Sequence, residues 1–170
     1  MKKLTIVLAL AMMLSLLAGC GNSEPTVTAP EGTNEELINK IYENVTVELP
    51  LVTMPVDTAD ADAVTYMTSL TDGSVIKEAS VSESMMGSQA YSLVLVRLND
   101  AAQAEATAQS MFDNINTRKW ICVEATEKQA VVCGDLVMFI MLDPQYGVTT
   151  DQIVEAFTTV CGGTVGTVIK

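Results

Sequence analysis

The run Leu136–Leu142 constrains the fold more than any other part of the 170-residue chain, because every residue in it is apolar. Side chains alternate between the two faces of a strand, so a strand of this composition must be covered on both sides or form an interface. The segment Tyr91–Leu98 also has apolar residues on both faces. This pattern predicts that Tyr91–Leu98 is a central strand and that Leu136–Leu142 is buried on both sides.

Turn residues and alternation predict further strands around these two. Gly134 and Asp135 form a tight-turn dipeptide between two apolar runs, which indicates a hairpin, and a second hairpin is expected where the chain turns at residues 84–88. The predicted strands are 75–82, 91–98, 118–123, 130–133 and 136–142, with a candidate edge strand at 164–169.

Capping residues followed by apolar positions at helical spacing predict four helices. Thr33 with Glu36, and Thr149 with Gln152, have the spacing of a capping box. The predicted helices are one that ends near Asn44, one at 60–70, one between Asp100 and Asn116, and one between Thr149 and Gly162. Together the elements predict an α+β fold, with helices packed on an antiparallel sheet of about four to five strands, as a single domain at residues 33–170.

The N-terminus has the pattern of a bacterial lipoprotein signal. Lys2 and Lys3 precede an apolar run at 4–17, and Ala18, Gly19 and Cys20 follow it. This pattern resembles a lipobox and predicts a signal peptide at 1–19, a lipidated Cys20 and a flexible tether at 20–32. A retained membrane anchor is disfavoured because the run is shorter than the roughly 20 residues that cross a bilayer. An ordinary secretory signal is the other alternative. The predicted location is the extracytoplasmic face of the cell membrane, with the lipid on Cys20 as the anchor.

The charge balance disfavours nucleic acid as a partner. The chain has 9 basic and 21 acidic side chains, and removal of residues 1–19 takes away two lysines and no acid, which leaves 7 basic against 21 acidic and a formal charge of −14. A surface of this sign repels polyanions. The chain also has no histidine, which excludes Ser-His-Asp and Cys-His catalysis and most zinc sites. No cofactor and no metal site is predicted.

Three cysteines remain after Cys20, and they allow two interpretations. Cys122, Cys133 and Cys161 are either small buried apolar residues, or Cys122 and Cys133 form a disulfide across a hairpin that turns at residues 127–128. None has the C-x-x-C spacing of a redox or zinc site.

The candidate contact residues are few. Trp120, the only tryptophan, stands next to Lys119 and close to Arg118 in a chain poor in basic residues, and Met85 and Met86 lie in a predicted turn. The alternative is that Trp120 and the two methionines are packed in the core while the basic residues are solvated. A contact patch is expected near Met85, Met86, Arg97, Arg118 and Trp120.

A resemblance to a known family follows from three stretches. The segment Ala90 to Arg97, preceded by Ser84 and Met86, the segment 118–123 and the Gly134-Asp135-Leu136 turn resemble a family of uncharacterised lipoproteins of Gram-positive gut bacteria, a family with a domain of unknown function. The resemblance covers roughly residues 33–142. It implies an envelope location and a lipid-anchored single domain, and it implies no activity or catalytic residue.

Three hypotheses for function are compatible with these patterns. The first is a lipid-anchored binding or interaction module of the cell envelope, whose partner is an envelope protein or a small ligand. The second is a histidine-free hydrolase or metal-dependent enzyme that uses Asp, Glu, Ser or Lys, and it predicts that acids such as Asp57, Asp60, Asp100 and Asp135 meet around one pocket. The third is a structural or quality-control lipoprotein.

Overall fold

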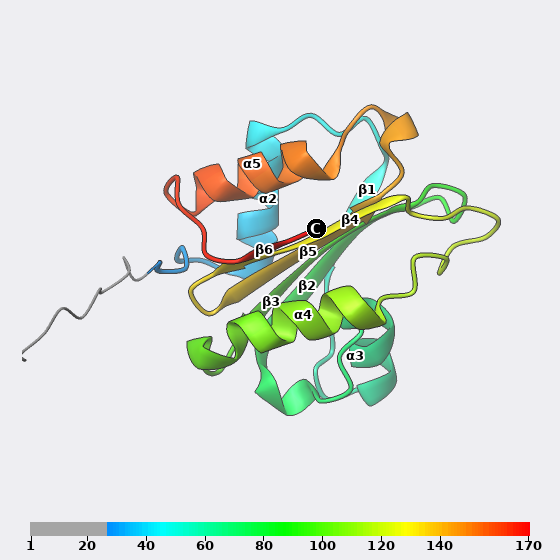
Figure 1. Ribbon diagram of the computed structural model, residues 1–170. Coiled ribbons are helices and arrows are strands. Elements are labelled where there is room, and N and C mark those ends of the chain that lie inside the picture. The colour runs from blue at the N-terminus through cyan, green and yellow to red at the C-terminus, as the bar shows by residue number, and fades with distance from the viewer. Residues whose placement is uncertain (1–26) are drawn as a thin grey trace, which may run out of the picture.

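A six-stranded antiparallel sheet forms the centre of the computed structural model, which describes residues 27–170. The strand order is β1-β2-β3-β5-β4-β6 (Figure 1). The strands are β1 (Leu51–Pro55), β2 (Ile76–Ser84), β3 (Tyr91–Leu98), β4 (Glu127–Cys133), β5 (Leu136–Leu142) and β6 (Val168–Ile169). The four α-helices of this region are α2 (Asn34–Asn44), α3 (Ala61–Thr68), α4 (Ala104–Asn114) and α5 (Thr150–Val160).

The helices cover both faces of the sheet. Figure 1 shows α2 and α5 on one face and α3 and α4 on the other. Each face has its own apolar core: Leu37, Leu93 and Phe157 are buried on the α2–α5 side, and Val94, Met111 and Phe139 on the α3–α4 side. Every residue of β3 and β5 is buried. The predicted α+β domain, with a central Tyr91–Leu98 strand and a covered Leu136–Leu142 strand, is therefore confirmed.

One predicted strand is absent, and one strand of the sheet was not predicted. Residues 118–123 form a loop, because Cys122 adopts a left-handed backbone conformation at φ 62° that breaks an extended chain. Conversely, Leu51–Pro55, for which no strand was predicted, pairs with β2 as an edge strand. Pro55 lies at the end of this edge strand, where a missing backbone N–H is tolerated. These two differences cancel, and the short β6 within the candidate edge strand at 164–169 gives six strands, one more than the upper predicted number.

The helix starts confirm the capping predictions. Thr33 and Thr149 both form complete capping boxes, with Glu36 and Gln152 as the partners. Asp60 caps α3 through the backbone N–H groups of residues 62 and 63. Asp100 caps a short 3-10 turn at Ala101–Gln103 that leads into α4.

A buried hydroxyl network ties α2 to the sheet. The Tyr42 hydroxyl donates to Ser82 Oγ at 2.8 Å and lies 3.2 Å from the Tyr91 hydroxyl. Burial raises the pKa of both tyrosines, and that of Tyr91 well above its usual value near 10.

We expect this network to make stability depend on alkaline pH. Above about pH 10 the tyrosines of the unfolded chain lose protons that the folded chain retains, so the free energy of unfolding falls as the pH rises. By pH 11 the loss is about 1 kcal/mol per tyrosine. Urea unfolding between pH 9 and pH 11 measures it. The Tyr42→Phe/Tyr91→Phe variant should lose less stability over this interval than the parent chain, and equal losses would contradict the assignment.

Candidate functional site

The two ends of the sheet differ in what they expose. Arg97 lies near the end of β3 and faces the β4–β5 turn, whereas Ser92 lies near the start of the same strand, beside the β2–β3 turn. At roughly 3.3 Å per residue, the two positions are separated by about 17 Å along the strand. The sequence-predicted patch residues are divided between these ends. Met85, Met86, Arg118 and Trp120 belong to one end and Arg97 to the other.

Two loops lie side by side at the end that carries Met85. The β2–β3 turn contains Met85, Met86 and Gly87, and the long loop 115–126 connects α4 to β4. The backbone N–H of Ile121 donates to the Gly87 carbonyl at 2.9 Å, which joins the loops directly. Figure 1 shows both loops projecting beyond the same end of the sheet, on the right of the view.

These loops expose three large apolar side chains. Met85 is 70% exposed, Met86 50% and Ile121 75%. We call these three residues the distal patch, because they lie at the end of the sheet remote from the N-terminal segment. Val52, opposite Glu83 in the β1–β2 register, is a further exposed apolar side chain at this end. The sequence did not single out Ile121, because an isoleucine next to a tryptophan is as typical of a buried strand as of an exposed loop.

The loop beneath the distal patch is held by an inward-pointing lysine. The Lys119 side chain is only 3% exposed and forms an ion pair with Glu83 of β2. Its ammonium group also lies 3.3 Å from Ser92 Oγ, and Ser92 Oγ donates to the same Glu83 carboxylate at 2.7 Å. The rings of Tyr66 and Trp120 lie 5.4 and 5.6 Å from the ammonium nitrogen, within the range of cation–π attraction.

The contacts among Glu83, Ser92 and Lys119 favour a structural role over a catalytic one. Ser92 is fully buried and its hydroxyl is already bonded to Glu83. Lys119 lines an open pocket of about 320 Å³ between α3 and the end of α4, and Ser92 is absent from its walls. A nucleophile must reach a substrate, and Ser92 does not. The Glu83–Lys119 pair instead fixes the loop that presents Ile121.

The neighbours of Lys119 take different positions. Arg118 is exposed and forms a surface ion pair with Glu124 at 3.2 Å. Trp120 is half-buried and packs against the apolar core on the α3–α4 face. Of the predicted patch, Met85 and Met86 are therefore exposed apolar side chains, whereas Trp120 is turned toward the core.

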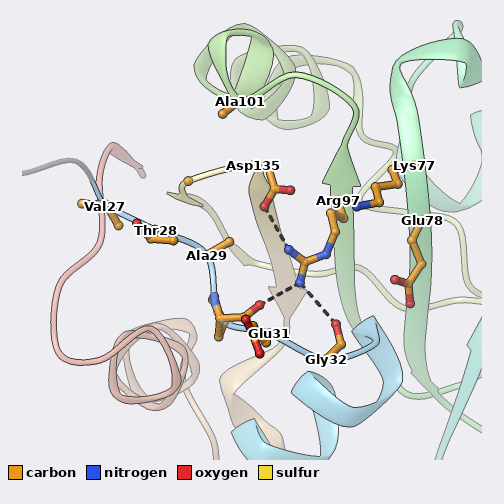
Figure 2. Close-up of a pocket in the computed structure, with 12 residues that line it drawn as sticks. Val27, Thr28, Ala29, Glu31, Gly32, Lys77, Glu78, Arg97, Ala101 and Asp135 are labelled. Atoms are coloured by element: carbon orange, nitrogen blue, oxygen red, sulfur yellow. Dashed lines mark hydrogen bonds and ion pairs between the residues drawn. The ribbon is translucent and has the colours of Figure 1, made fainter.

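Arg97 performs a separate structural task at the opposite end. It lies in the wall of an open pocket of about 550 Å³ between the sheet and residues 27–32. One nitrogen donates to Asp135 at 2.9 Å, and the other donates to the carbonyls of Pro30 and Gly32 at 3.0 and 3.4 Å (Figure 2). Both terminal nitrogens of the guanidinium are thus bonded, and one of them holds the end of the predicted tether against the domain.

The β4–β5 turn is shaped to accept this segment. Gly134 has φ 61°, and a Cβ placed on it would come within 2.6 Å of the Ala29 backbone nitrogen. Only glycine fits both the conformation and the close approach. The Cys133 thiol adds a bond to the Thr28 carbonyl at 3.7 Å. Residues 27–32, predicted as flexible spacer, therefore lie docked along the sheet end.

The acids proposed for catalysis do not meet around a shared pocket within residues 27–170. Asp57 and Asp60 bond backbone N–H groups at the start of α3, Asp100 caps the turn before α4, and Asp135 pairs with Arg97. In the same region no three acidic or cysteine side chains are close enough to hold a metal ion. None of the described helices is long and apolar enough to span a bilayer.

The cysteines lie apart from the arrangement expected for a Cys122–Cys133 disulfide. Residues 127 and 128 lie inside β4, so no hairpin turns there. Cys122 is exposed in the distal loop, and Cys133 is buried at the opposite end of the sheet. All three described cysteines are free thiols. Cys20, the predicted lipid-attachment residue, lies outside the described residues.

Comparison of the chain with models of protein families, with curated proteins and with solved structures gives no match.

We expect Lys119→Met to loosen the distal loop and destabilise the domain. Methionine keeps the length of the side chain but leaves the mostly buried Glu83 without its partner, which should cost about 3 kcal/mol in the free energy of unfolding. Urea unfolding measures the loss, and hydrogen exchange at the Ile121 amide reports on the loop.

The adjacent Arg118→Met is the matched control. It removes a charge from the same loop, but its ion pair with Glu124 is exposed and should contribute less than about 1 kcal/mol. If both variants lose the same small amount of stability, the buried pair does not fasten the loop.

Proposed function

We propose that the protein is a lipid-anchored binding module on the extracytoplasmic face of the cell membrane, and that it engages a partner protein through the distal patch. The observation that supports this proposal most directly is the exposure of Met85, Met86 and Ile121 together at one end of the sheet. Apolar side chains gathered on a surface are typical of protein interaction sites.

The position of the patch fits an anchored protein. The chain enters the domain at residues 27–32, which lie at the Arg97 end of the sheet. Residues 20–26 reach at most about 25 Å when fully extended, so lipid on Cys20 would hold that end near the membrane. The distal patch lies at the other end of β3, where a partner has access to it.

The chemistry of the surface favours a protein partner. Methionine side chains adapt to different apolar surfaces, and two of the three patch residues are methionines. The formal charge of −14 predicted after removal of residues 1–19 opposes polyanions such as nucleic acid. A patch built on three large side chains suits a transient contact better than a permanent one.

The other hypotheses have weaker support. The acids named for an enzyme are each bonded within their own turn or ion pair, so no specific observation favours hydrolysis. A structural or quality-control role stays a prediction, as does the resemblance to lipoproteins of Gram-positive bacteria.

Photo-crosslinking in intact cells tests the interaction. A photoreactive amino acid placed at Met86 or Ile121 should yield a discrete adduct with a protein, and Met85→Ser should weaken the adduct formed from Ile121. The matched control is the same photoreactive residue at Val168, an exposed apolar side chain on the edge strand β6. Absence of adducts at positions 86 and 121, or equal adducts at 168, would reject the distal patch as the binding surface.

A second experiment tests the anchor on its own. We expect Cys20→Ala to move the protein from the membrane fraction to the soluble fraction, because the acyl chains can no longer be attached. Cys122→Ala is the control, since it removes an exposed thiol from the domain without touching the anchor. Retention of Cys20→Ala in the membrane fraction would contradict lipidation at this residue while leaving the patch to its own test.

A further inference from the structure

The open pocket between α3 and the C-terminal end of α4 has no part in the proposed function. Its volume is about 320 Å³, and none of the three distal-patch residues lines it. Figure 1 shows the two helices on the same face of the sheet, with α3 beside the end of α4. Ligand sites in proteins have volumes of about 300–1,000 Å³, so this pocket suits a small ligand.

Hydroxyl and amide groups make up most of the pocket wall. Asn114 and Asn116 of the α4 end contribute the amide groups. Five of the nine lining residues carry a hydroxyl group: Thr65, Tyr66, Ser69, Thr71 and Ser110. Pockets for apolar ligands are lined mainly by apolar side chains. This wall instead favours a ligand that is itself rich in hydroxyl groups.

Three of the hydroxyl groups are available to a ligand. The Thr65 hydroxyl donates to the Leu70 carbonyl at 3.2 Å. The hydroxyls of Tyr66, Ser69 and Thr71, in contrast, have no hydrogen-bond partner within the part of the chain that the structure describes. Each of these hydroxyls can both donate and accept a hydrogen bond.

The two amides add complementary groups. The Asn114 amino group donates to the Ser110 carbonyl at 2.8 Å, which leaves the Asn114 side-chain oxygen as an acceptor. The Asn116 side-chain oxygen accepts from the Arg118 backbone N–H at 3.0 Å, which leaves the Asn116 amino group as a donor. The pocket thus offers donors and acceptors together.

Ser69 places its hydroxyl in the pocket wall at a conformational cost. It ends α3 in the left-handed conformation, at φ 62° and ψ 15°. Helices commonly end in this conformation, but the residue is usually glycine, because a Cβ atom makes the conformation unfavourable. A serine is less stable here than a glycine, and the group that it adds is a hydroxyl at the pocket.

The pocket has no free charge, although the chain is acidic. None of the described residues that line it is acidic, whereas the whole chain has 21 acidic side chains. Lys119 is the one basic residue among them, and its ammonium group is paired with Glu83. An anionic ligand would find no unpaired positive charge, and a cationic ligand would find no carboxylate. The ligand that fits is therefore neutral.

We propose that this pocket binds a neutral sugar ring, either as a free monosaccharide or as one unit of a glycan. Sugar hydroxyls donate and accept hydrogen bonds, as the groups of the wall require. The ring of Tyr66, a residue that is 56% exposed, offers an apolar surface for the C–H face of the sugar ring. The proposal depends neither on the distal patch nor on lipidation of Cys20.

Saturation-transfer NMR with the full-length, detergent-extracted protein tests sugar binding. The probes are glucose, galactose, mannose and N-acetylglucosamine at millimolar concentration, with glucuronate as the anionic comparison. At least one neutral sugar should receive saturation from the protein, and glucuronate should receive less. Linear trimers of the bound sugar distinguish the sources: tighter binding assigns a glycan, and equal or weaker binding assigns the free sugar. Absence of transfer to every neutral sugar, or a preference for glucuronate, would overturn the proposal.

Ser69→Gly locates the site without a risk to folding. Glycine suits the left-handed conformation, so the variant should unfold at or above the Tm of the parent chain. Its Kd for the sugar should rise about three- to tenfold, as for one lost hydrogen bond. Tyr66→Ala, at an exposed position, should raise the Kd by a similar factor of about three- to tenfold.

Two control variants lie outside the pocket. Ser88→Gly removes an exposed hydroxyl from the β2–β3 turn, and Met85→Ser alters the distal patch. Both should bind the sugar as the parent chain does. Unchanged affinity in Ser69→Gly and Tyr66→Ala, or an equal loss in Ser88→Gly, would place the sugar elsewhere and overturn the proposal.

Discussion

The structure depends on the burial of β3 and β5 on both faces. Their side chains pack into two apolar cores, one under each helix layer. A strand pair of this composition is insoluble unless both faces are covered. The chain therefore needs helices on each side, and it supplies them from segments before, between and after the hairpins. The remaining elements of the domain are arranged around that requirement.

Helices on both faces leave the two ends of the sheet uncovered. Different segments of the chain cover these two ends. One end is closed by its own N-terminal segment, which Arg97 and the Gly134 turn hold in place. The other end is covered by a loop that Lys119 fastens from inside through Glu83. The first end is polar and closed by hydrogen bonds. The second has a polar interior and an apolar exterior, which is why it is the better candidate for binding.

The sequence was informative where a pattern is local. Alternation, capping boxes and the Gly134–Asp135 dipeptide predicted β2 to β5, α2, α3 and α5, because each depends on neighbouring residues. Contacts between distant segments left no such signal. Lys119 and Glu83 are 36 positions apart, and no periodicity relates them. The segment 118–123 was also mistaken for a strand. In the loop that it forms, Trp120 faces the core and Ile121 faces solvent, and this alternation is the same as that of a half-buried strand. Of the residues grouped in the predicted patch, Met85 and Met86 lie exposed in one loop, whereas Arg97 bonds at the other end of the sheet.

The docking of residues 27–32 has a mechanical consequence. Any pull on the chain from its N-terminal side reaches the domain first at the bonds to Arg97 and Cys133, before it reaches α2. Those bonds join the segment to Arg97 of β3 and to Cys133 at the end of β4, so the load passes directly into the sheet and bypasses the first helix. In a domain tethered at that side, tension would enter at the sheet end opposite to the loops that carry the distal patch.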